Sequence, residues 1–224
     1  MVDRQIIQKE ADAYFLRNKE VIDKTECSAG MRVFGEFYDE CRDTLKIKNM
    51  LEVGCCTGYN LMFMNKRYGI TASGIEPSPK AVEYGKEKIF EQRLNVEIKQ
   101  GFADKLPYAD GVFDLVYLGF CMYQVDRDTL FYTLAETDRV VKRGGICVIT
   151  DFDTPLRYVR ENTHNKDIFT YKADYSVYLV PYGYTLIYKK MYTHNTRGFE
   201  PDVQERLSTQ IFYKEKIKDI YVKD

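Results

Sequence analysis

The sequence predicts an α/β fold: a doubly wound, mostly parallel sheet of seven strands with an antiparallel hairpin at its C-terminal edge. Two observations predict it. Short apolar segments typical of buried parallel strands alternate with segments of helical period between residues 46 and 153. Two further strand-like segments, 185–192 and 205–214, then follow each other with no helical segment between them, as in an antiparallel pair.

The individual elements follow from local signals. Ser78 and Pro79 mark a helix start, because serine caps helix N-termini and proline is favoured at the first helical position. Residues 154–175 show neither the helical nor the strand period, and we expect an irregular segment there. We expect helices at 5–20, 31–45, 57–69, 78–92 and 127–142, and strands at 47–54, 71–77, 95–100, 112–118 and 146–152, the last beginning straight after Gly144 and Gly145.

Length and charge exclude several classes of protein. With 224 residues the chain fits one domain, and residues 1–224 are interpreted as such. Acidic and basic residues nearly cancel, at a formal net charge of −1, which argues against nucleic acid as the main partner. No apolar run reaches the roughly 18 residues that a membrane-spanning helix needs.

Cysteine and histidine usage indicates a reducing compartment and no metal. The six cysteines form no C-x-x-C pair, and the N-terminal residues lack the apolar core of a signal peptide, so we expect reduced thiols and a cytoplasmic location. Only two histidines are present, in no H-x₃-H spacing, and therefore no metal site is expected.

The first predicted strand ends in a glycine-containing turn that carries the first functional motif. A nicotinamide fingerprint would need glycine at positions 54, 56 and 59, but Cys56 and Tyr59 stand at two of them. The segment resembles motif I of class I S-adenosylmethionine-dependent methyltransferases, with Cys56 replacing the middle glycine. The resemblance implies a Rossmann-like fold and this cofactor, with the product S-adenosylhomocysteine. It places Glu52, Gly54, Cys55, Gly58 and Asn60 at the cofactor.

The chemistry of this cofactor suits such a turn. S-adenosylmethionine carries an amino-acid portion and a sulfonium cation in place of a pyrophosphate. Glycines allow the backbone to approach the methionine portion closely, and a carboxylate favours the cationic end. The alternative is a glycine-rich turn that binds nothing.

Further segments match the same family in the same order. Glu76 and Pro77 end the second strand, where the family's acidic residue binds both ribose hydroxyls. The segment from Gly101 to Tyr108 resembles the loop that reads the adenine ring, which implies that Phe102, Ala103 and Asp104 lie at the cofactor. Phe102 replaces the usual acidic residue, so that either Asp104 takes over its role or Phe102 stacks beside the ring.

The family also assigns the remaining regions. The end of the fourth strand, Leu118, Gly119 and Phe120, would form the rim of the cofactor pocket, and residues 46–153 would form the cofactor-binding core. Residues 1–45 would form a helical lid whose Tyr14 reaches the pocket. Residues 154–224 would supply the acceptor pocket and the last two strands.

Two residues are candidates for catalysis. Tyr123 follows the pocket rim, where it could orient the acceptor or simply pack on the next helix. His164 lies in the irregular segment, where the family places much of its acceptor pocket, and histidine is the usual side-chain base. A solvated histidine is the alternative, and His194, in an expected turn, is the second histidine of the chain.

A tyrosine-rich region suggests where the acceptor binds and what kind of molecule it is. Eight of the 19 tyrosines lie between Tyr158 and Tyr192, and Tyr158, Tyr171 and Tyr175 fall in the irregular segment, which makes them candidate substrate-binding residues. The stretch from Gly101 to Asp128 also resembles methyltransferases associated with bacterial surface-polysaccharide synthesis. That resemblance implies a small-molecule acceptor, either a carbohydrate or a nucleotide-linked precursor, methylated on oxygen.

Other interpretations stay open. Carbon or nitrogen methylation of another metabolite, as in the quinone-methylating relatives, is the second enzymatic hypothesis. A non-catalytic S-adenosylmethionine-binding module would keep Glu52, Gly54 and Glu76 yet have no polar group at the methyl end of the pocket. The oligomeric state is left open by the sequence.

Overall fold

The computed structural model describes residues 2–162, 164–194, 198, 199 and 201–216. Its main feature is a seven-stranded sheet, which confirms the predicted fold class. In spatial order the strands are β3 (Val96–Gln100), β2 (Thr71–Glu76), β1 (Asn49–Val53), β4 (Phe113–Gly119), β5 (Val141–Phe152), β9 (Leu207–Lys214) and β8 (Tyr184–Tyr192).

Strand pairing agrees with the predicted topology. The pairs β3–β2, β2–β1, β1–β4 and β4–β5 are parallel, whereas β9 runs antiparallel to both β5 and β8. The C-terminal hairpin is therefore confirmed, with β9 inserted beside β5 and β8 at the edge. The strand order reverses between β1 and β4, and parallel sheets of this kind bind ligands at such a switch point, outside the carboxyl ends of the strands.

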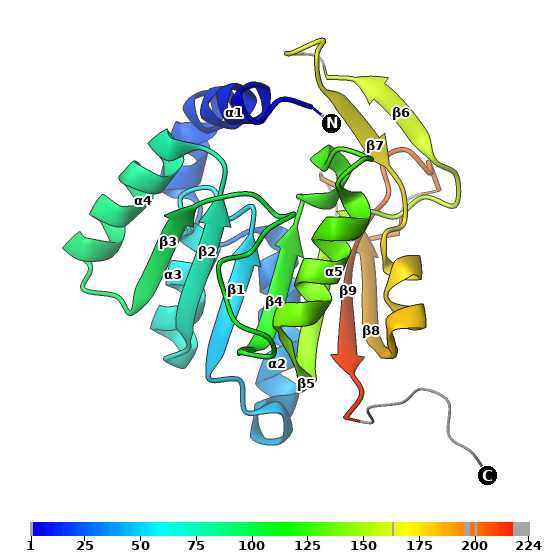
Figure 1. The fold of residues 1–224 in the computed structure, drawn as a ribbon. Helices are drawn as coiled ribbons and strands as arrows, with labels where there is room; N and C mark the ends of the chain where they lie inside the picture. The colour runs from blue at the N-terminus through cyan, green and yellow to red at the C-terminus, as the bar shows by residue number, and fades with distance from the viewer. Residues whose placement is uncertain (1, 163, 195–197, 200, 217–224) are drawn as a thin grey trace.

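Helices cover both faces of the sheet (Figure 1). On one face α2 (Ala29–Leu45), α3 (Tyr59–Tyr68) and α4 (Pro79–Glu91) pack over a buried cluster that includes Phe34 and Leu61. On the other face α5 (Leu130–Val140) and the short 3-10 helices η2 (Ser176–Tyr178) and η3 (Val180–Tyr182) cover a second cluster that includes Leu134 and Leu179.

The predicted start of α4 is confirmed. Ser78 is its N-cap, with Oγ accepting a hydrogen bond from the amide of Ala81 at 3.0 Å, and Pro79 is its first residue. This cap satisfies one of the amide groups that the first helical turn leaves unpaired. The end of β2 and the start of α4 are thereby held in a defined position beside the switch point.

Two local expectations were wrong. The helix expected at 127–142 is shorter, and β5 begins at Val141, three residues before the glycine pair; Gly144 lies within the strand at φ 80°. The segment 154–175 is also not wholly irregular, because β6 (Tyr158–Glu161) and β7 (Phe169–Lys172) form an antiparallel hairpin. Both strands have four residues and are largely exposed or half-buried, so they lack the alternation that would have revealed them.

Two elements lie above the carboxyl ends of the parallel strands: the long helix α1 (Arg4–Lys24) and the β6–β7 hairpin (Figure 1). Helix α1 contacts α4, and β7 contacts the short 3-10 helix η1 (Met122–Gln124) that follows β4. In the described part of the chain, no helix is long and apolar enough to cross a membrane.

Candidate functional site

A cavity of about 530 Å³ opens at the switch point, between the strand ends below and helix α1 and the β6–β7 hairpin above. Nine of the residues that the sequence placed at the cofactor line it: Tyr14, Glu52, Gly54, Cys55, Asn60, Glu76, Pro77, Gly119 and Phe120. Gly58, Phe102, Ala103, Asp104 and Leu118 are not among the lining residues, and Leu118 is wholly buried in the core.

The turn after β1 has an unusual backbone. Gly54 and Gly58 both adopt φ 75°, and a Cβ on Gly58 would come within 2.6 Å of Cδ1 of Ile98. Cys56 adopts φ 49°, a left-handed conformation that side chains disfavour and glycine accepts readily. The cysteine thus retains the backbone shape of the glycine that the family motif has at this position.

Glu52 is a buried carboxyl group with one oxygen unsatisfied. Its Oε1 accepts a hydrogen bond from Nδ2 of Asn60 at 2.7 Å, and Oδ1 of Asn60 in turn accepts one from the amide of Ser28 at 2.8 Å. Oε2 has no partner in the described structure, although Glu52 lines the cavity. Burial raises the pKa of Glu52 to about 8. A cationic amino group in the cavity would satisfy this oxygen.

Glu76 ends β2 and is anchored by backbone amides. Oε1 accepts from the amide of Ser78 at 2.9 Å and Oε2 from the amide of Cys56 at 2.8 Å. Burial raises the pKa of this carboxyl group to about 7, against the lowering effect of the two amides. Each carboxylate oxygen has a second lone pair, so a group anchored in this way can still accept two hydroxyl hydrogen bonds.

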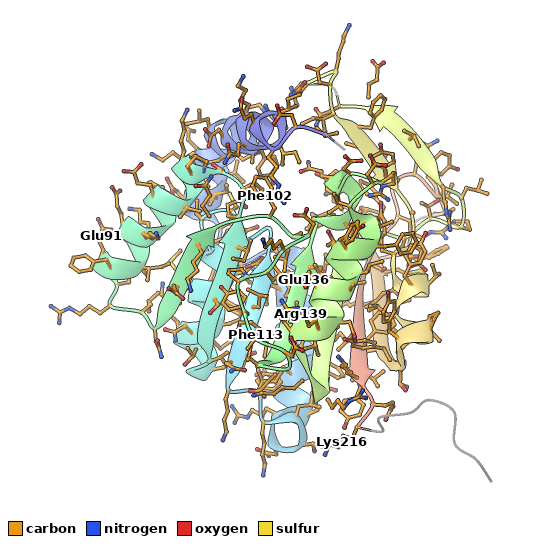
Figure 2. The ribbon with its side chains drawn as sticks, viewed as in Figure 1. Glu91, Phe102, Phe113, Glu136, Arg139 and Lys216 are labelled. Atoms are coloured by element: carbon orange, nitrogen blue, oxygen red, sulfur yellow. The ribbon has the colours of Figure 1, made fainter. Side chains whose placement is uncertain are left out.

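The loop expected to read adenine contacts helix α1. The Arg4 guanidinium lies 4.6 Å from the centre of the Phe102 ring, and its Nη2 is 3.0 Å from Oδ2 of Asp104. Figure 2 labels Phe102 below helix α1. The structure therefore places Phe102 and Asp104 against helix α1 and outside the cavity lining.

The same loop is held from α5 by Glu136 and Arg139, a contact that the sequence did not predict. Glu136 accepts a hydrogen bond from the amide of Leu106 at 2.7 Å, and Arg139 donates to the carbonyls of Tyr108 at 2.7 Å and Leu106 at 3.1 Å. Glu136 and Arg139 also pair with each other at 2.6 Å; both are labelled on α5 in Figure 2. Their i, i+3 spacing was the available signal, but it only identifies a helical ion pair.

At the other end of the cavity the wall comes from the segment after β4, from β7 and from the end of β8. Tyr123 and Tyr171, both predicted, line it, as do Phe120 and His194. Phe120 has a left-handed φ of 49°, and its ring stacks on His194 with centroids 5.6 Å apart. Burial lowers the pKa of His194, which favours the neutral imidazole.

The other candidates lie elsewhere. His164 is exposed in the loop between β6 and β7, where its amide donates to Oδ1 of Asn162, and it does not line the cavity. Tyr158, in β6, is half-buried and also outside the lining. Tyr175 is buried, with its hydroxyl donating to the carbonyl of Tyr171 and accepting from Nη1 of Arg127 at 3.1 Å. Its hydroxyl is therefore engaged in holding β7.

A buried carboxyl group supports this wall from behind. Asp151, in β5, accepts hydrogen bonds from the amide of Phe152 at 2.8 Å and the amide of Tyr123 at 3.2 Å. Burial raises its pKa to about 7. Sequence reasoning missed it because a lone aspartate near a strand end is a weak signal. Its effect is to fix the backbone of Tyr123 against the end of β5.

The described residues contain no group of three or more histidine, cysteine, aspartate or glutamate side chains placed to hold a metal ion. The six cysteines are all free thiols. Burial raises the pKa of Cys55 and Cys121 at the cavity wall, so both are held as neutral thiols. The ionisable chemistry of the site thus rests on carboxyl groups, tyrosines and one histidine.

Comparison with known proteins agrees with the methyltransferase prediction for the core. The protein-family model described as "Methyltransferase domain" matches residues 51–149. Norajmaline N-methyltransferase from Rauvolfia serpentina is 34% identical over 53% of this chain and 40% of its own length. Demethylmenaquinone methyltransferase from Halalkalibacterium halodurans is 34% identical over 51% of this chain and 49% of its own length. This chain therefore spans less than half of these curated relatives.

Solved structures show the same fold at low identity. The Burkholderia thailandensis 1,6-didemethyltoxoflavin-N1-methyltransferase, solved with 1,6-didemethyltoxoflavin and S-adenosylhomocysteine, has a TM-score of 0.70 at 12% identity, covering 94% of this chain and 88% of that one. The crystal structure of MccD protein has a TM-score of 0.64 at 16% identity, covering 85% of this chain and 100% of that one. At these identities the likeness establishes the class I methyltransferase fold.

Proposed function

We propose that this chain, whose residues 51–149 match the methyltransferase domain, transfers a methyl group from S-adenosylmethionine to a small-molecule acceptor. One arrangement carries the proposal. Glu52 presents an unpaired carboxylate oxygen at the end of β1, and Glu76 presents an amide-anchored carboxylate at the end of β2, both in the same cavity. The first suits an ammonium group and the second suits the two hydroxyls of a ribose.

The roles of the chain's own residues follow from this geometry. The cofactor, when bound, supplies an activated methyl group on a positively charged sulfur. Glu52 would hold its amino group and Glu76 its ribose, while the positive φ of Gly54 brings the backbone close to it. Helix α1, whose Tyr14 lines the cavity, would exclude water from the reaction. Methyl transfer needs mainly this alignment and desolvation.

The acceptor can be a molecule methylated on oxygen, nitrogen or carbon. Oxygen methylation of a carbohydrate or of a nucleotide-linked precursor is the hypothesis from the sequence. Transfer to nitrogen or carbon is supported by relatives named as N-methyltransferases and as demethylmenaquinone methyltransferases. The non-catalytic alternative has less support, because the acceptor end of the cavity contains Tyr123 and His194 as polar groups.

Calorimetric titration of the purified chain with S-adenosylhomocysteine tests the proposal. We expect one site with micromolar affinity, and then transfer of a labelled methyl group to members of an acceptor panel, detected by mass shift. Folded protein that does not bind this product at millimolar concentration would contradict the proposal. Binding without transfer to any acceptor would favour the non-catalytic module.

A further inference from the structure

The proposed acceptor end of the cavity has a wall of aromatic side chains. Phe120, Tyr123, Phe169 and Tyr171 contribute aromatic side chains, and Ile168 and Leu207 are apolar residues of the same lining. These residues come from the segment after β4, from the β6–β7 hairpin and its loop, and from β9. Elements far apart in the sequence thus assemble one mostly apolar surface. Such a surface favours ligands with flat or apolar faces.

One pair of rings is held in a stacked arrangement. The Phe120 and His194 rings are inclined at only 27° with centroids 5.6 Å apart, and the Phe152 ring meets His194 edge-on at 6.3 Å. The backbone of Phe120 is left-handed, and its amide donates a hydrogen bond to the carbonyl of Thr150 at 2.7 Å. The backbone therefore fixes this ring at the rim, where it lines the cavity.

The charged residues that line the cavity are all acidic in the described part of the chain. Among the described lining residues these are Glu10, Glu52, Glu76 and Asp126, and none is a lysine or an arginine. Glu10 is paired with Arg17 at 2.7 Å, and Glu52 and Glu76 lie at the proposed cofactor end. The buried carboxyl group of Asp151 lies behind Tyr123 and accepts a hydrogen bond from its amide at 3.2 Å. Phosphate and carboxylate ligands are normally recognised by arginine, lysine or clustered amides.

Two cations next to the lining residue Tyr171, Arg127 over its ring at 4.1 Å and Lys172 after it in β7, already have partners. Arg127 donates to the carbonyl of Met122 at 2.9 Å, to the carbonyl of Val125 and to the hydroxyl of Tyr175. The Lys172 ammonium donates to the carbonyl of Gln204 at 2.8 Å and lies over the Phe152 ring. Neither is a lining residue of the cavity. An anionic group would therefore meet acidic residues and no lysine or arginine in the described lining of the cavity.

We infer that the acceptor is a ring-bearing molecule that carries no phosphate or carboxylate, neutral or cationic, and that its ring packs against Phe120 and His194. This rests on the proposed function, because the same cavity must hold the cofactor. It narrows that function by excluding nucleotide-linked and other phosphorylated acceptors. A neutral sugar, a phenol or an amine on a ring remains within the class.

Matched probes test the inference on the full chain saturated with S-adenosylhomocysteine. The probes are 2-naphthol and 2-naphthyl phosphate, which share a ring, and tryptamine and indole-3-acetate, which share another. Calorimetry should show 2-naphthol and tryptamine binding at least about tenfold more tightly than their anionic counterparts. Equal or tighter binding of either anion would overturn the inference, as would failure of both ring probes to bind at millimolar concentration.

Variants separate this result from the proposed function. His194→Ala removes one half of the stacked pair and should weaken binding of the neutral probe about tenfold, with affinity for S-adenosylhomocysteine unchanged. His164→Ala, an exposed histidine outside the cavity, is the matched control and should change neither. If His194→Ala leaves probe binding intact, the stacking site is wrong. If the unaltered chain does not bind S-adenosylhomocysteine, the proposed function is contradicted instead.

Discussion

The amide of Cys56 donates a hydrogen bond of 2.8 Å to Oε2 of Glu76, which ties the turn after β1 to the end of β2. The same carboxyl group accepts the amide of Ser78 at the start of α4. Glu76 therefore joins three segments that meet at the switch point of the sheet. The left-handed φ of Cys56 is the conformation in which its amide reaches this carboxylate.

Cys56→Gly should be more stable to unfolding than Cys56→Ala by about 1 kcal/mol, because glycine accepts a left-handed φ that alanine disfavours. Both substitutions remove the thiol, so alanine is the control for loss of the side chain. Chemical denaturation of the two variants measures the difference. Equal stabilities would show that the strain at position 56 is relieved in some other way.

Glu76→Ala should weaken binding of S-adenosylhomocysteine by about 2 to 3 kcal/mol, the scale of hydrogen bonds to a charged group. Calorimetry measures it, with circular dichroism to verify folding, because Glu76 also holds Cys56 and Ser78. Glu97→Ala, an exposed position on the neighbouring strand β3, is the control and should bind normally. Unchanged affinity in Glu76→Ala would remove Glu76 from the cofactor site.

Glu52 predicts a pH dependence of stability in the free protein. Its pKa rises from 4.5 in the unfolded chain to about 8 in the folded one, so the folded state holds this proton more tightly. That contribution is fully present below pH 4.5 and is lost as the pH rises through about 8. Glu52→Gln stays neutral, and its melting temperature should fall less between pH 5 and pH 8 than that of the unaltered chain. An identical fall in both would contradict this.

Ionisation of Glu52 should also make cofactor binding depend on pH, with affinity increasing as the pH rises. An ammonium group beside Glu52 favours the ionised carboxylate, so affinity for S-adenosylhomocysteine should rise as the pH increases from 6 to 8, by at most about tenfold per pH unit. Calorimetry at several pH values checks this. Glu52→Gln should bind more weakly and with a flatter profile. The remaining slope would come from Glu76, whose pKa is raised to about 7.

Replacing each of the two histidines by alanine should affect turnover differently. His194 lines the cavity with its pKa lowered by burial, so it is neutral near pH 7 and able to take a proton from an acceptor. We expect His194→Ala to reduce turnover about 100-fold for an acceptor that must lose a proton, at unchanged cofactor affinity. His164→Ala should keep nearly full turnover, since that residue is exposed and outside the cavity. The reverse result would restore the sequence hypothesis for His164.

The core and the cofactor end of the site could be predicted because their signals are local. Glu52, Gly54 and Glu76 lie at strand ends whose apolar runs and bounding glycines are visible in the sequence, and parallel strands bring their carboxyl ends together. The cap at Ser78 is equally local. For these residues, position along a predicted strand was enough to place them in one cavity.

The acceptor end could not be predicted in the same way. His194, Phe120 and Tyr171 meet only after the hairpin β6–β7 folds over the sheet and β8 takes its place at the edge. Those contacts join segments that show little helical or strand period. The sequence therefore gave no local signal to tell which of His164 and His194 lies in the cavity. Likewise, nothing local showed that Arg4 would lie on Phe102 or that Asp151 would support Tyr123.

By itself, then, the sequence determined the doubly wound sheet, its antiparallel edge and the carboxylates at the ends of β1 and β2, because hydrophobic period and turn residues act over a few positions. Only the tertiary structure decided which histidine and which tyrosines line the cavity, and that the charged residues in its described lining are all acidic. The reason is physical: burial and long-range packing choose these neighbours, and both depend on the whole fold.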